Sequence, residues 1–586
     1  MIRKQCQSAA WGTRFLRLCA VILSASLAYA GSPKIAKDLV GARPSDRVNV
    51  IIQFTQAPTA RHHQMVLNRG GQLKYDLGLV KSGAYSVPAS ALAALANDPA
   101  IAHISLDHTV RTTVDSSTTL DYAIQTINGN YATSRGLDGT GIGVAVIDSG
   151  IDDVNDLHNA NGNFRVVYSQ NFTGDGTGSA GDQYGHGTHV AGIIGGNGMH
   201  SSGSQYFANI HGVAPNVNLI NLRVLDQNGV GTDSAVIAAI NQAIHLKNIY
   251  NIKVINLSLG RGVFESYTKD PLCNAVEQAT KAGIVVVVAA GNNGRNNSAG
   301  TNGYGTISAP GNDPYVITVG AMNTMGTPSR GDDQIASYSS KGPTLFDHVV
   351  KPDLVAPGNR IISLYSSGLT LNQLFPSNEI PYSLYQVNGN SGASDTYYRL
   401  SGTSMAAPMV SGTVALMLQQ NPSLNPYQVK ARLMKTASKV FPTSSTVVDP
   451  VTGISYTSQY DLFTVGAGYL DIQAALSNTD VANGNVFSPT AAFTTDSSGN
   501  VTVSLNTGDS VWNKSVVWGT SVVWGTNVLV NGSSVVWGSS VCWGSSTTQA
   551  YSVLWGSSVV WGSSVVWGTS QQDAVESLNI TIHGEN

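Results

Sequence analysis

The run at 284–290, Ile-Val-Val-Val-Val-Ala-Ala, contains no polar residue, and it constrains the fold more than any other part of the chain. Side chains alternate between the two faces of a strand, so a strand of this composition must be buried on both faces. Similar runs occur at 143–147, 219–225, 254–259 and 315–320, with helical patterns at 189–195, 233–247 and 271–282. The sequence therefore predicts an α/β domain with a doubly wound parallel sheet, whose site lies beyond the carboxyl ends of the strands.

Four polar residues of different chemistry stand at predicted strand ends or helix starts. Asp148 directly follows the first apolar run, His186 is flanked by glycines, and Asn292 follows the all-apolar run. Ser404 precedes the apolar helical run at 409–419. A carboxylate, an imidazole, an amide and a hydroxyl are the orienting acid, base, oxyanion donor and nucleophile that acyl transfer requires.

Each of these residues also has a purely structural explanation when it is taken alone. Ser404 and Asp148 are common helix-cap types, His186 suits a satisfied interior position, and Asn292 suits a turn after glycine. Only their coincidence in one domain favours catalysis. Ser401 and Thr403, the hydroxyl residues beside Ser404, are expected to be turn residues.

Several sequence blocks resemble the signatures of the subtilisin-like serine peptidases. These blocks are Asp148-Ser149-Gly150, His186-Gly187-Thr188-His189, Ala290-Gly291-Asn292 and Gly402-Thr403-Ser404-Met405-Ala406-Ala407-Pro408. The resemblance implies that Ser404 attacks the scissile carbonyl, that His186 acts as base and then acid, and that Asp148 orients His186. The side chain of Asn292 and the backbone N–H of Ser404 would bind the oxyanion.

The resemblance also implies a substrate cleft. Gly229-Val230-Gly231 would be the edge strand that pairs with an extended substrate, and Ser258-Leu259-Gly260 would be the facing strand and one wall of the pocket for the side chain before the cut. Asn293 and Ser308 fall near that pocket and are not acidic. We therefore expect a medium or large uncharged side chain there rather than Lys or Arg.

No cofactor is expected for the chemistry, but the resemblance leaves a structural calcium ion open. Asp156 resembles a family calcium ligand, although the loop at 199–210 that should supply the other ligands contains no carboxylate. Carbonyl oxygens alone can also bind calcium. His186 and His189 might suggest zinc by their spacing, but the resemblance gives His186 another role.

Residues 1–30 have the pattern of a secretory signal. Basic residues precede the apolar run at 18–27, and Ala28-Tyr29-Ala30 offers a small-residue cleavage site. The run is shorter than a membrane span, so we expect a secreted or cell-surface protein with no span after signal removal. Cys273 and Cys542 would then remain, and nothing predicts that they pair.

Residues 31–115 alternate strand and helix patterns in the order of a small α+β, ferredoxin-like module. Strands are expected at 48–54, 83–87 and 100–106, and helices at 58–68 and 89–97. The family resemblance implies an inhibitory propeptide, a partner within the same chain that is removed by self-cleavage between 112 and 119. We expect His62 and His63 to be surface histidines rather than a metal pair.

The peptidase domain is expected at 116–478 and a C-terminal extension at 479–586. An insert at 366–395 is better explained as a surface decoration than as an overhang of the cleft. Residues 515–572 lack charge and repeat Ser-Val-Val-Trp-Gly-Ser/Thr, which predicts a repetitive β-rich tail. Either the tryptophans pack inside this tail, or they form a row that contacts a glycan or cell surface.

The charge of the chain excludes a nucleic-acid partner. The net charge is −3, and no run of Lys and Arg follows the N-terminal segment. Of two rivals, the related acid-acting peptidases use a glutamate where His186 stands, and an inert adhesive protein would not need all four catalytic residue types. The sequence thus predicts a serine endopeptidase that is made as a self-processing zymogen and acts on peptide or protein substrates.

Overall fold

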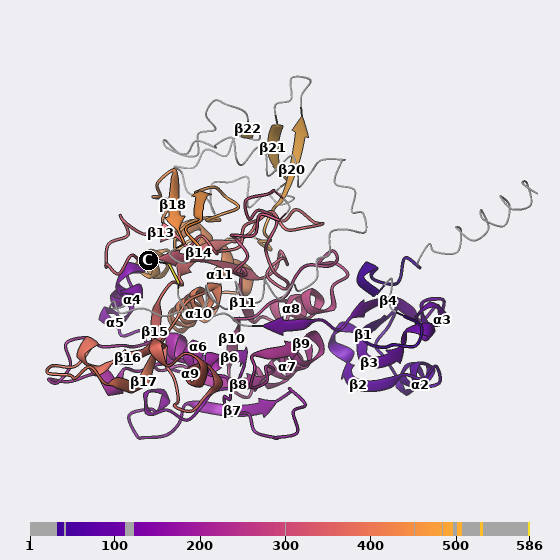
Figure 1. Ribbon diagram of the computed structural model, residues 1–586, viewed down its shortest axis with the longest axis horizontal. Coiled ribbons are helices and arrows are strands. Elements are labelled where there is room, and N and C mark those ends of the chain that lie inside the picture. The colour runs from indigo at the N-terminus through magenta and orange to yellow at the C-terminus, as the bar shows by residue number, and fades with distance from the viewer. Residues whose placement is uncertain are drawn as a thin grey trace, which may run out of the picture. The chain divides into compact units, whose positions relative to one another are not determined.

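The computed structural model describes residues 32–39, 43–111, 122–298, 300–449, 452–482, 484–495, 501–506, 528–530 and 584–585. The chain divides into two compact units, Met1–Leu106 and Asp107–Asn586 (Figure 1). The expected signal at 1–30 lies outside the described residues. Among the residues that are described, no helix is long and apolar enough to cross a membrane.

The first unit is an antiparallel sheet with two helices. Its elements are β1 (Arg47–Phe54), α2 (Ala60–Leu67), β2 (Gln72–Leu77), β3 (Ser82–Pro88), α3 (Leu92–Ala96) and β4 (Ile101–Leu106). The strand order is β2-β3-β1-β4, and every pair is antiparallel. The sequence missed β2 because this edge strand buries only Leu77 and therefore carries no apolar signal.

The prediction that His62 and His63 are surface histidines is wrong for His62. His62 is buried beside the ring of Phe54, and its Nδ1 accepts a hydrogen bond from the backbone N–H of Thr59 at 3.1 Å. This contact caps the start of α2. His63 instead forms a hydrogen bond with the Tyr85 hydroxyl at 2.7 Å. Both imidazoles therefore have structural partners within the unit.

The second unit is built on an eight-stranded sheet in the order β13-β12-β11-β10-β6-β8-β7, with β14 pairing with β12. Its strands are β6 (Gly143–Asp148), β7 (Val166–Asn171), β8 (Asn218–Arg223), β10 (Ile252–Leu257), β11 (Val285–Ala289), β12 (Ile317–Asn323), β13 (Gln334–Ile335) and β14 (Leu354–Pro357). All pairs are parallel except β12 with β13. The predicted parallel sheet is confirmed, with one antiparallel edge strand.

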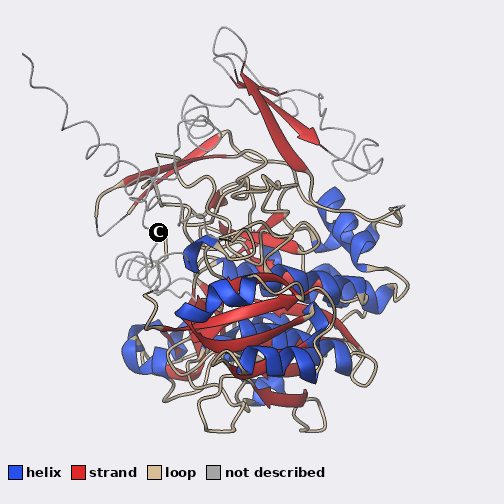
Figure 2. Cartoon of the chain, turned by 90° about the vertical axis from the view of Figure 1, so that its right-hand side faces the viewer, coloured by secondary structure: helices blue, strands red, loops and turns tan. Residues whose placement is uncertain are grey.

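Helices cover both faces of this sheet (Figure 2). On one face lie α6 (His186–Gly195) and α10 (Thr403–Gln420), whose side chains share a core cluster with Val285, Val287 and Ala289 of β11. The alternate β11 residues point to the other face. The helices α7 (Asp233–Leu246) and α8 (Pro271–Lys281) contact each other and also contact the sheet.

The helix α10 is the central element of the second unit and lies next to β10, β11 and α6 (Figure 1). It is buried at every position from Thr403 to Leu418, so this part of the helix has no solvent-exposed face. The helix begins at Thr403, before the apolar run at 409–419 from which it was predicted. Ser404 consequently lies in its first turn, as expected.

The smaller elements of the second unit complete the fold around the sheet. They are β5 (Thr109–Arg111), α4 (Ala123–Thr126), α5 (Asn130–Ser134), β9 (Val230–Thr232), β15 (Ile361–Leu364), α9 (Thr370–Leu374), β16 (Glu379–Pro381), β17 (Ala393–Leu400), α11 (Pro426–Thr436), β18 (Ser444–Val448), β19 (Ser455–Gln459), α12 (Ile472–Ser477), β20 (Thr490–Thr495), β21 (Val501–Asn506) and β22 (Val528–Val530).

The insert at 366–395, expected to be a surface decoration, is hydrogen-bonded to the segment before His186. The backbone N–H groups of Thr370 and Leu371 in α9 donate to the carbonyl oxygens of Gln183 and Tyr184, at 3.2 Å and 3.0 Å. These acceptors directly precede His186 in the chain. The insert therefore supports the loop that leads to His186, which the sequence did not reveal.

The tail is described only in part. The strands β20, β21 and β22 form an antiparallel sheet. The tryptophan repeat and Cys542 lie outside the described residues, apart from 528–530. Cys273 is buried and free.

The burial of α10 predicts a large effect of a core truncation there. Leu416→Ala should lower the free energy of unfolding by about 2–5 kcal/mol, because Leu416 is fully buried and the change leaves a cavity. The exposed Ile249, 69% accessible, is the control, and Ile249→Ala should change stability by about 0.5 kcal/mol or less. Denaturant unfolding in a Ser404→Ala background measures both. Equal losses would contradict the central place of α10.

Candidate active site

Asp148 and His186 form a buried hydrogen bond at the carboxyl end of the parallel sheet. Asp148 is the last residue of β6 and His186 the first residue of α6. Nδ1 of His186 and Oδ1 of Asp148 are 2.7 Å apart, and the two side chains are 0% and 1% exposed. Because the carboxylate accepts from Nδ1–H, Nε2 is left unprotonated in the neutral ring. Among the described residues, Nε2 has no hydrogen-bond partner.

A close backbone contact brings α6 to the end of β6. A Cβ atom at Gly187 would lie 2.1 Å from the carbonyl oxygen of Gly150. Only glycine fits there, so the start of the helix can touch the turn after Asp148. Gly187 therefore has a packing function.

Ser404 is held against the end of β10. Its Oγ donates to the carbonyl oxygen of Ser258 at 2.9 Å, and Oγ of Ser258 donates to the carbonyl oxygen of Ser404 at 2.7 Å. Since β10 pairs with β6, Ser404 lies at the same edge of the sheet as Asp148. In this structure the Ser404 hydroxyl therefore donates to Ser258 and not to His186.

Thr403 fixes the orientation of the Asn292 amide. The Oδ1 atom of Asn292 accepts from the backbone N–H and from Oγ1 of Thr403, both at 2.9 Å. Because a backbone N–H can only donate, this contact assigns the oxygen side of the amide and directs its NH2 group away from Thr403. Thr403 is therefore more than the turn residue we expected. Ser401 accepts a hydrogen bond from the backbone N–H of Arg360 at 2.8 Å.

Asp182 connects the turn after Asp148 to the start of the helix that begins with His186. No sequence pattern singled out this residue. Its carboxylate accepts from Oγ of Ser149 at 2.9 Å, from the backbone N–H of Gly185 at 2.7 Å, and from the backbone N–H and Oγ1 of Thr188 at 2.9 Å and 2.8 Å. It thus ties the turn after Asp148 to the first turn of α6. Its position shortly before His186 was the available signal.

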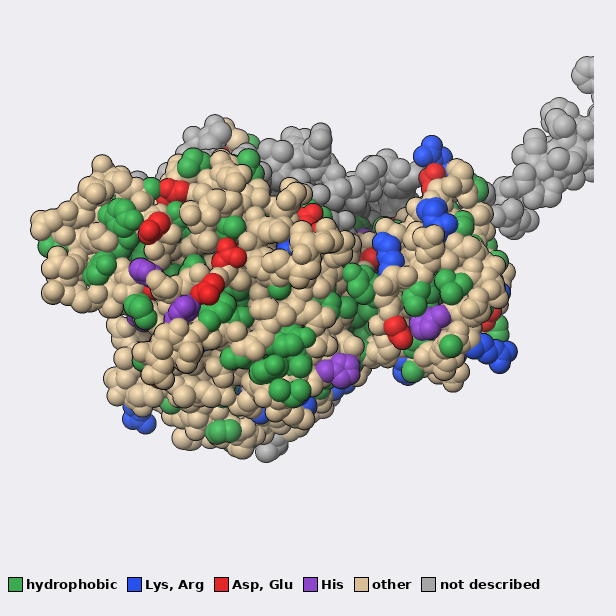
Figure 3. Space-filling model, turned by 90° about the horizontal axis from the view of Figure 1, so that it is seen from below, with side chains coloured by type: hydrophobic (Ala, Val, Ile, Leu, Met, Phe, Trp, Pro, Cys, Tyr) green, Lys and Arg blue, Asp and Glu red, His purple; other side chains and the backbone are tan. Residues whose placement is uncertain are grey.

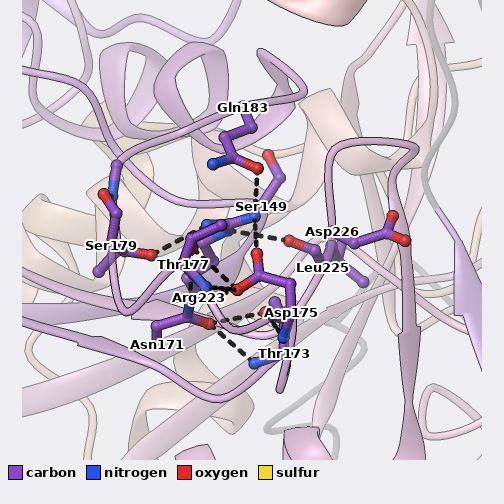
Figure 4. Close-up of polar contacts among 12 residues, drawn as sticks. Ser149, Asn171, Thr173, Asp175, Thr177, Ser179, Gln183, Arg223, Leu225 and Asp226 are labelled. Carbon is purple, nitrogen blue, oxygen red and sulfur yellow. Dashed lines mark hydrogen bonds and ion pairs between the residues drawn. The ribbon is translucent and has the colours of Figure 1, made fainter.

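Arg223 lies beside Asp148 in the register of β6 and β8 and is fully buried. Figure 4 shows its guanidinium surrounded by oxygen atoms from the loop before His186. Nη2 donates to Asp175 Oδ2 at 2.8 Å and to Gln183 Oε1 at 2.9 Å, and Nη1 donates to the carbonyl oxygen of Ser179 at 2.9 Å. One buried cation therefore holds the loop at 175–183 against the sheet.

The residues around Asp156 do not fit a calcium ion. Oδ1 accepts from the backbone N–H and Nδ1 of His200 at 2.9 Å and 2.7 Å, and Oδ2 accepts from the Tyr397 hydroxyl at 2.7 Å. A backbone N–H donor on the carboxylate occupies the place that a cation would need. Among the described residues there is also no group of three or more His, Cys, Asp or Glu that could hold a metal.

Of the two predicted cleft strands, only one is a strand in the structure, since β9 covers Val230–Thr232 whereas Ser258-Leu259-Gly260 follows the end of β10 at Leu257. The strand β9 pairs antiparallel with β5, with Thr109 opposite Thr232 and Arg111 opposite Val230. A Cβ at Gly260 would meet the carbonyl oxygen of Ala309 at 3.0 Å and Cβ of Ser308 at 3.1 Å. Gly260 and Ser308 therefore lie together, and Asn293 is exposed.

Comparisons with known proteins identify the family of this chain. Residues 139–485 match the model of the subtilase family. Serine protease AprX of Bacillus subtilis is 34% identical over 408 residues, covering 67% of this chain and 83% of that protein. Subtilisin E of the same species is 32% identical over 400 residues, covering 68% and 87%.

A solved structure shows the same fold. Fervidolysin from Fervidobacterium pennivorans, a keratinolytic enzyme related to subtilisin, superposes with a TM-score of 0.55 at 22% identity, covering 80% of this chain and 69% of that one. The fold and the relatives together define a subtilisin-like serine peptidase. The chain belongs to the subtilase family.

The contact between Thr403 and Asn292 predicts a kinetic effect without loss of the fold. Thr403→Val keeps the backbone N–H and the branched shape but removes Oγ1, so kcat on a peptide substrate should fall roughly 3- to 10-fold with little change in KM. Thr413→Val is the matched control, because Thr413 is also buried in α10 and its hydroxyl donates to the carbonyl oxygen of Met409 in the same helix. Equal kinetics of the two variants would contradict the role of Thr403.

The carboxyl group of Asp152 predicts a pH-dependent stability effect. Burial and the neighbouring Asp182 raise its pKa from 3.8 to about 6. Folding therefore favours the neutral form, and the stability that this form contributes is present below pH 3.8 and is lost as the pH rises through about 6. In a Ser404→Ala background, Asp152→Asn should raise Tm at pH 8 but not at pH 4. A Tm change of the same size at both values would contradict this assignment.

Proposed function

We propose that this peptidase is a secreted endopeptidase that hydrolyses peptide bonds through Asp148, His186 and Ser404. The observation that carries the proposal is the buried 2.7 Å contact between Asp148 and His186 at the sheet edge where Ser404 also lies. It supplies an oriented base for a hydroxyl at a helix start, which is the arrangement that acyl transfer needs.

In the proposed reaction, the Ser404 hydroxyl turns from Ser258 to His186 and gives its proton to Nε2 as Oγ bonds to the scissile carbonyl carbon. The imidazolium is stabilised by Asp148 and then protonates the leaving amine, so the peptide C–N bond breaks and an acyl-enzyme remains. Water, deprotonated by His186, hydrolyses the ester and restores Ser404. No cofactor takes part in these steps.

The oxyanion would be bound by the NH2 group of Asn292 and the backbone N–H of Ser404. The contacts of Thr403 support this role, since they direct the amide group of Asn292 before substrate arrives. The start of α10 adds backbone N–H groups and the positive end of the helix dipole. Such preorganised donors typically contribute about 10²- to 10³-fold to turnover.

We further propose that the first unit is an inhibitory propeptide with a ferredoxin-like fold. Its β-α-β-β-α-β order and its antiparallel sheet support this. The stretch at 109–111, which follows that unit in the chain, pairs antiparallel with β9, the strand proposed to bind substrate. A chain seated there occupies the cleft as a substrate would, and self-cleavage at 112–119 would release it.

The domain limits proposed from the sequence are a signal at 1–30, a propeptide at 31–115, a peptidase domain at 116–478 and an extension at 479–586. The substrates would be peptides with an uncharged side chain before the cut, since Asn293 and Ser308 are uncharged. The face in Figure 3 carries few and scattered Lys and Arg side chains, which supports a protein rather than a nucleic-acid partner.

Active-site labelling tests the proposal. The self-processed protein should react covalently with an organofluorophosphate at Ser404, which is detected by intact mass and peptide mapping, and Ser404→Ala should not react. Ser411→Ala is the matched control, because Ser411 is another buried serine of α10 and contacts Asn256 rather than the catalytic residues. It should still be labelled.

The same proteins test the zymogen. The protein with Ser404 should acquire a new N-terminus between 113 and 120, whereas Ser404→Ala should keep the first unit in one chain. Processing of purified Ser404→Ala, or labelling that survives this change, would contradict the proposed function.

A further inference from the structure

Glu585 is buried on the second unit although it is far from its partners in the sequence. Its side chain is 0% exposed and forms an ion pair between Oε1 and Nη2 of Arg295 at 2.8 Å. The backbone N–H of Ser337 donates to both carboxylate oxygens, at 2.8 Å and 3.0 Å, and its hydroxyl also contacts Oε1. A buried carboxylate is stable only with such a full set of donors.

The backbone of Glu585 is also bound. Its N–H donates to Oδ1 of Asn359 at 3.1 Å, and Nδ2 of Asn359 donates to its carbonyl oxygen at 3.0 Å. This paired contact recognises an extended backbone, whereas Arg295 and Ser337 recognise the carboxylate. The site therefore binds both the backbone and the side-chain carboxylate of an acidic residue in a peptide.

The pocket is organised by the second unit itself. Nε of Arg295 donates to Oγ of Ser337 at 2.7 Å, and Nη1 pairs with Asp449 Oδ2 at 2.7 Å. The Arg295 guanidinium also lies over the ring of Tyr456, 4.7 Å from its centroid. The Arg295 guanidinium is therefore held by Asp449 and Tyr456 in the position where it binds the carboxylate of Glu585.

The chain that leads to Glu585 starts on the same unit. The Val350 N–H donates to the carbonyl oxygen of Pro489 at 2.8 Å, and the Ala491 N–H donates to that of His348 at 2.8 Å. Oγ of Ser488 donates to Asp353 at 2.6 Å. The segment after 491, which contains the tryptophan repeat, is therefore anchored near its beginning and again at Glu585.

We propose that Arg295, Ser337 and Asn359 form a docking site for the acidic segment Gly584-Glu585 of this chain, so that the stretch between Ala491 and Gly584 is closed into a loop that is bound to the second unit on both sides. A peptide-bond cut inside the tail then leaves both fragments attached. In an enzyme that cuts peptide bonds, this site retains the repeat after such a cut.

A cut-and-retain experiment tests the docking and is independent of catalysis, because it uses full-length protein with Ser404→Ala. A recognition site for tobacco etch virus protease is inserted after Gly532, and the cut protein is analysed by size-exclusion chromatography. The C-terminal fragment should elute with the rest of the chain. Glu585→Gln keeps the side-chain size but removes the charge, so it should weaken retention at least about ten-fold.

The control and a second measurement keep the test decisive. Glu576→Gln makes the same charge change elsewhere in the tail and should leave retention unchanged. A synthetic peptide of residues 578–586 should release the fragment in a concentration-dependent way, and the same peptide with Gln at 585 should require at least about ten-fold more. Loss of the fragment from the protein with Glu585, or equal retention with Glu585→Gln, would overturn the proposal.

Discussion

The buried hydrogen bond between Asp148 and His186 is the contact on which the rest of the site depends. A carboxylate at the end of a fully buried strand is costly unless donors surround it, and an imidazole next to it is useful only in one orientation. The fold supplies donors to one carboxylate oxygen, because Oδ1 of Asp148 accepts from the backbone N–H of Ser149 and from Nδ1 of His186, both at 2.7 Å, whereas Oδ2 has no hydrogen-bond partner among the described residues. Backbone contacts position the imidazole. Gly187 allows the close approach of α6, and Asp182 holds the turn after Asp148 to the start of that helix.

The start of α10 is the second organising point. Ser404 is bound to Ser258 at the end of β10, and Thr403 is bound to Asn292 after β11. The N–H of Gly402 donates to the carbonyl oxygen of Gly358, next to Asn359 of the Glu585 pocket, at 2.8 Å. The proposed nucleophile, the proposed oxyanion donor and the proposed docking site of the tail are therefore connected through short segments of backbone rather than through long side chains.

Much of this fold could be predicted from the sequence because buried parallel strands have a strong apolar signal. Two of the strands that the sequence did not predict, β2 and β7, are sheet edges whose side chains are largely polar and partly exposed. The short strands β13, β14 and β15 were also missed, and β14 and β15 are fully buried but have only four residues each. The site residues in glycine-rich blocks were also accessible to sequence reasoning, because their residue types identify acyl-transfer chemistry. The resemblance to a known family then placed them together.

Residues that act through distant partners could not be predicted in this way. The hydroxyl of Tyr397, from another part of the chain, donates to Oδ2 of Asp156. This donor stands where the calcium ion that the sequence left open would need to bind. Glu585 reaches Arg295 across 290 positions. Thr403 stands beside the predicted nucleophile, but only the contact with Asn292 reveals its role. In each case the partner is set by tertiary structure, and no local pattern reports it.

The central claim is that Ser404 and His186 act as one catalytic unit, and a double-variant comparison of kcat/KM tests it most directly. The measurement uses one peptide substrate with Ser404→Ala, His186→Ala and the combined variant. If the two residues are parts of one proton-transfer step, the combined variant will be about as slow as either single variant. Losses that multiply in the combined variant would show independent contributions and would contradict the account.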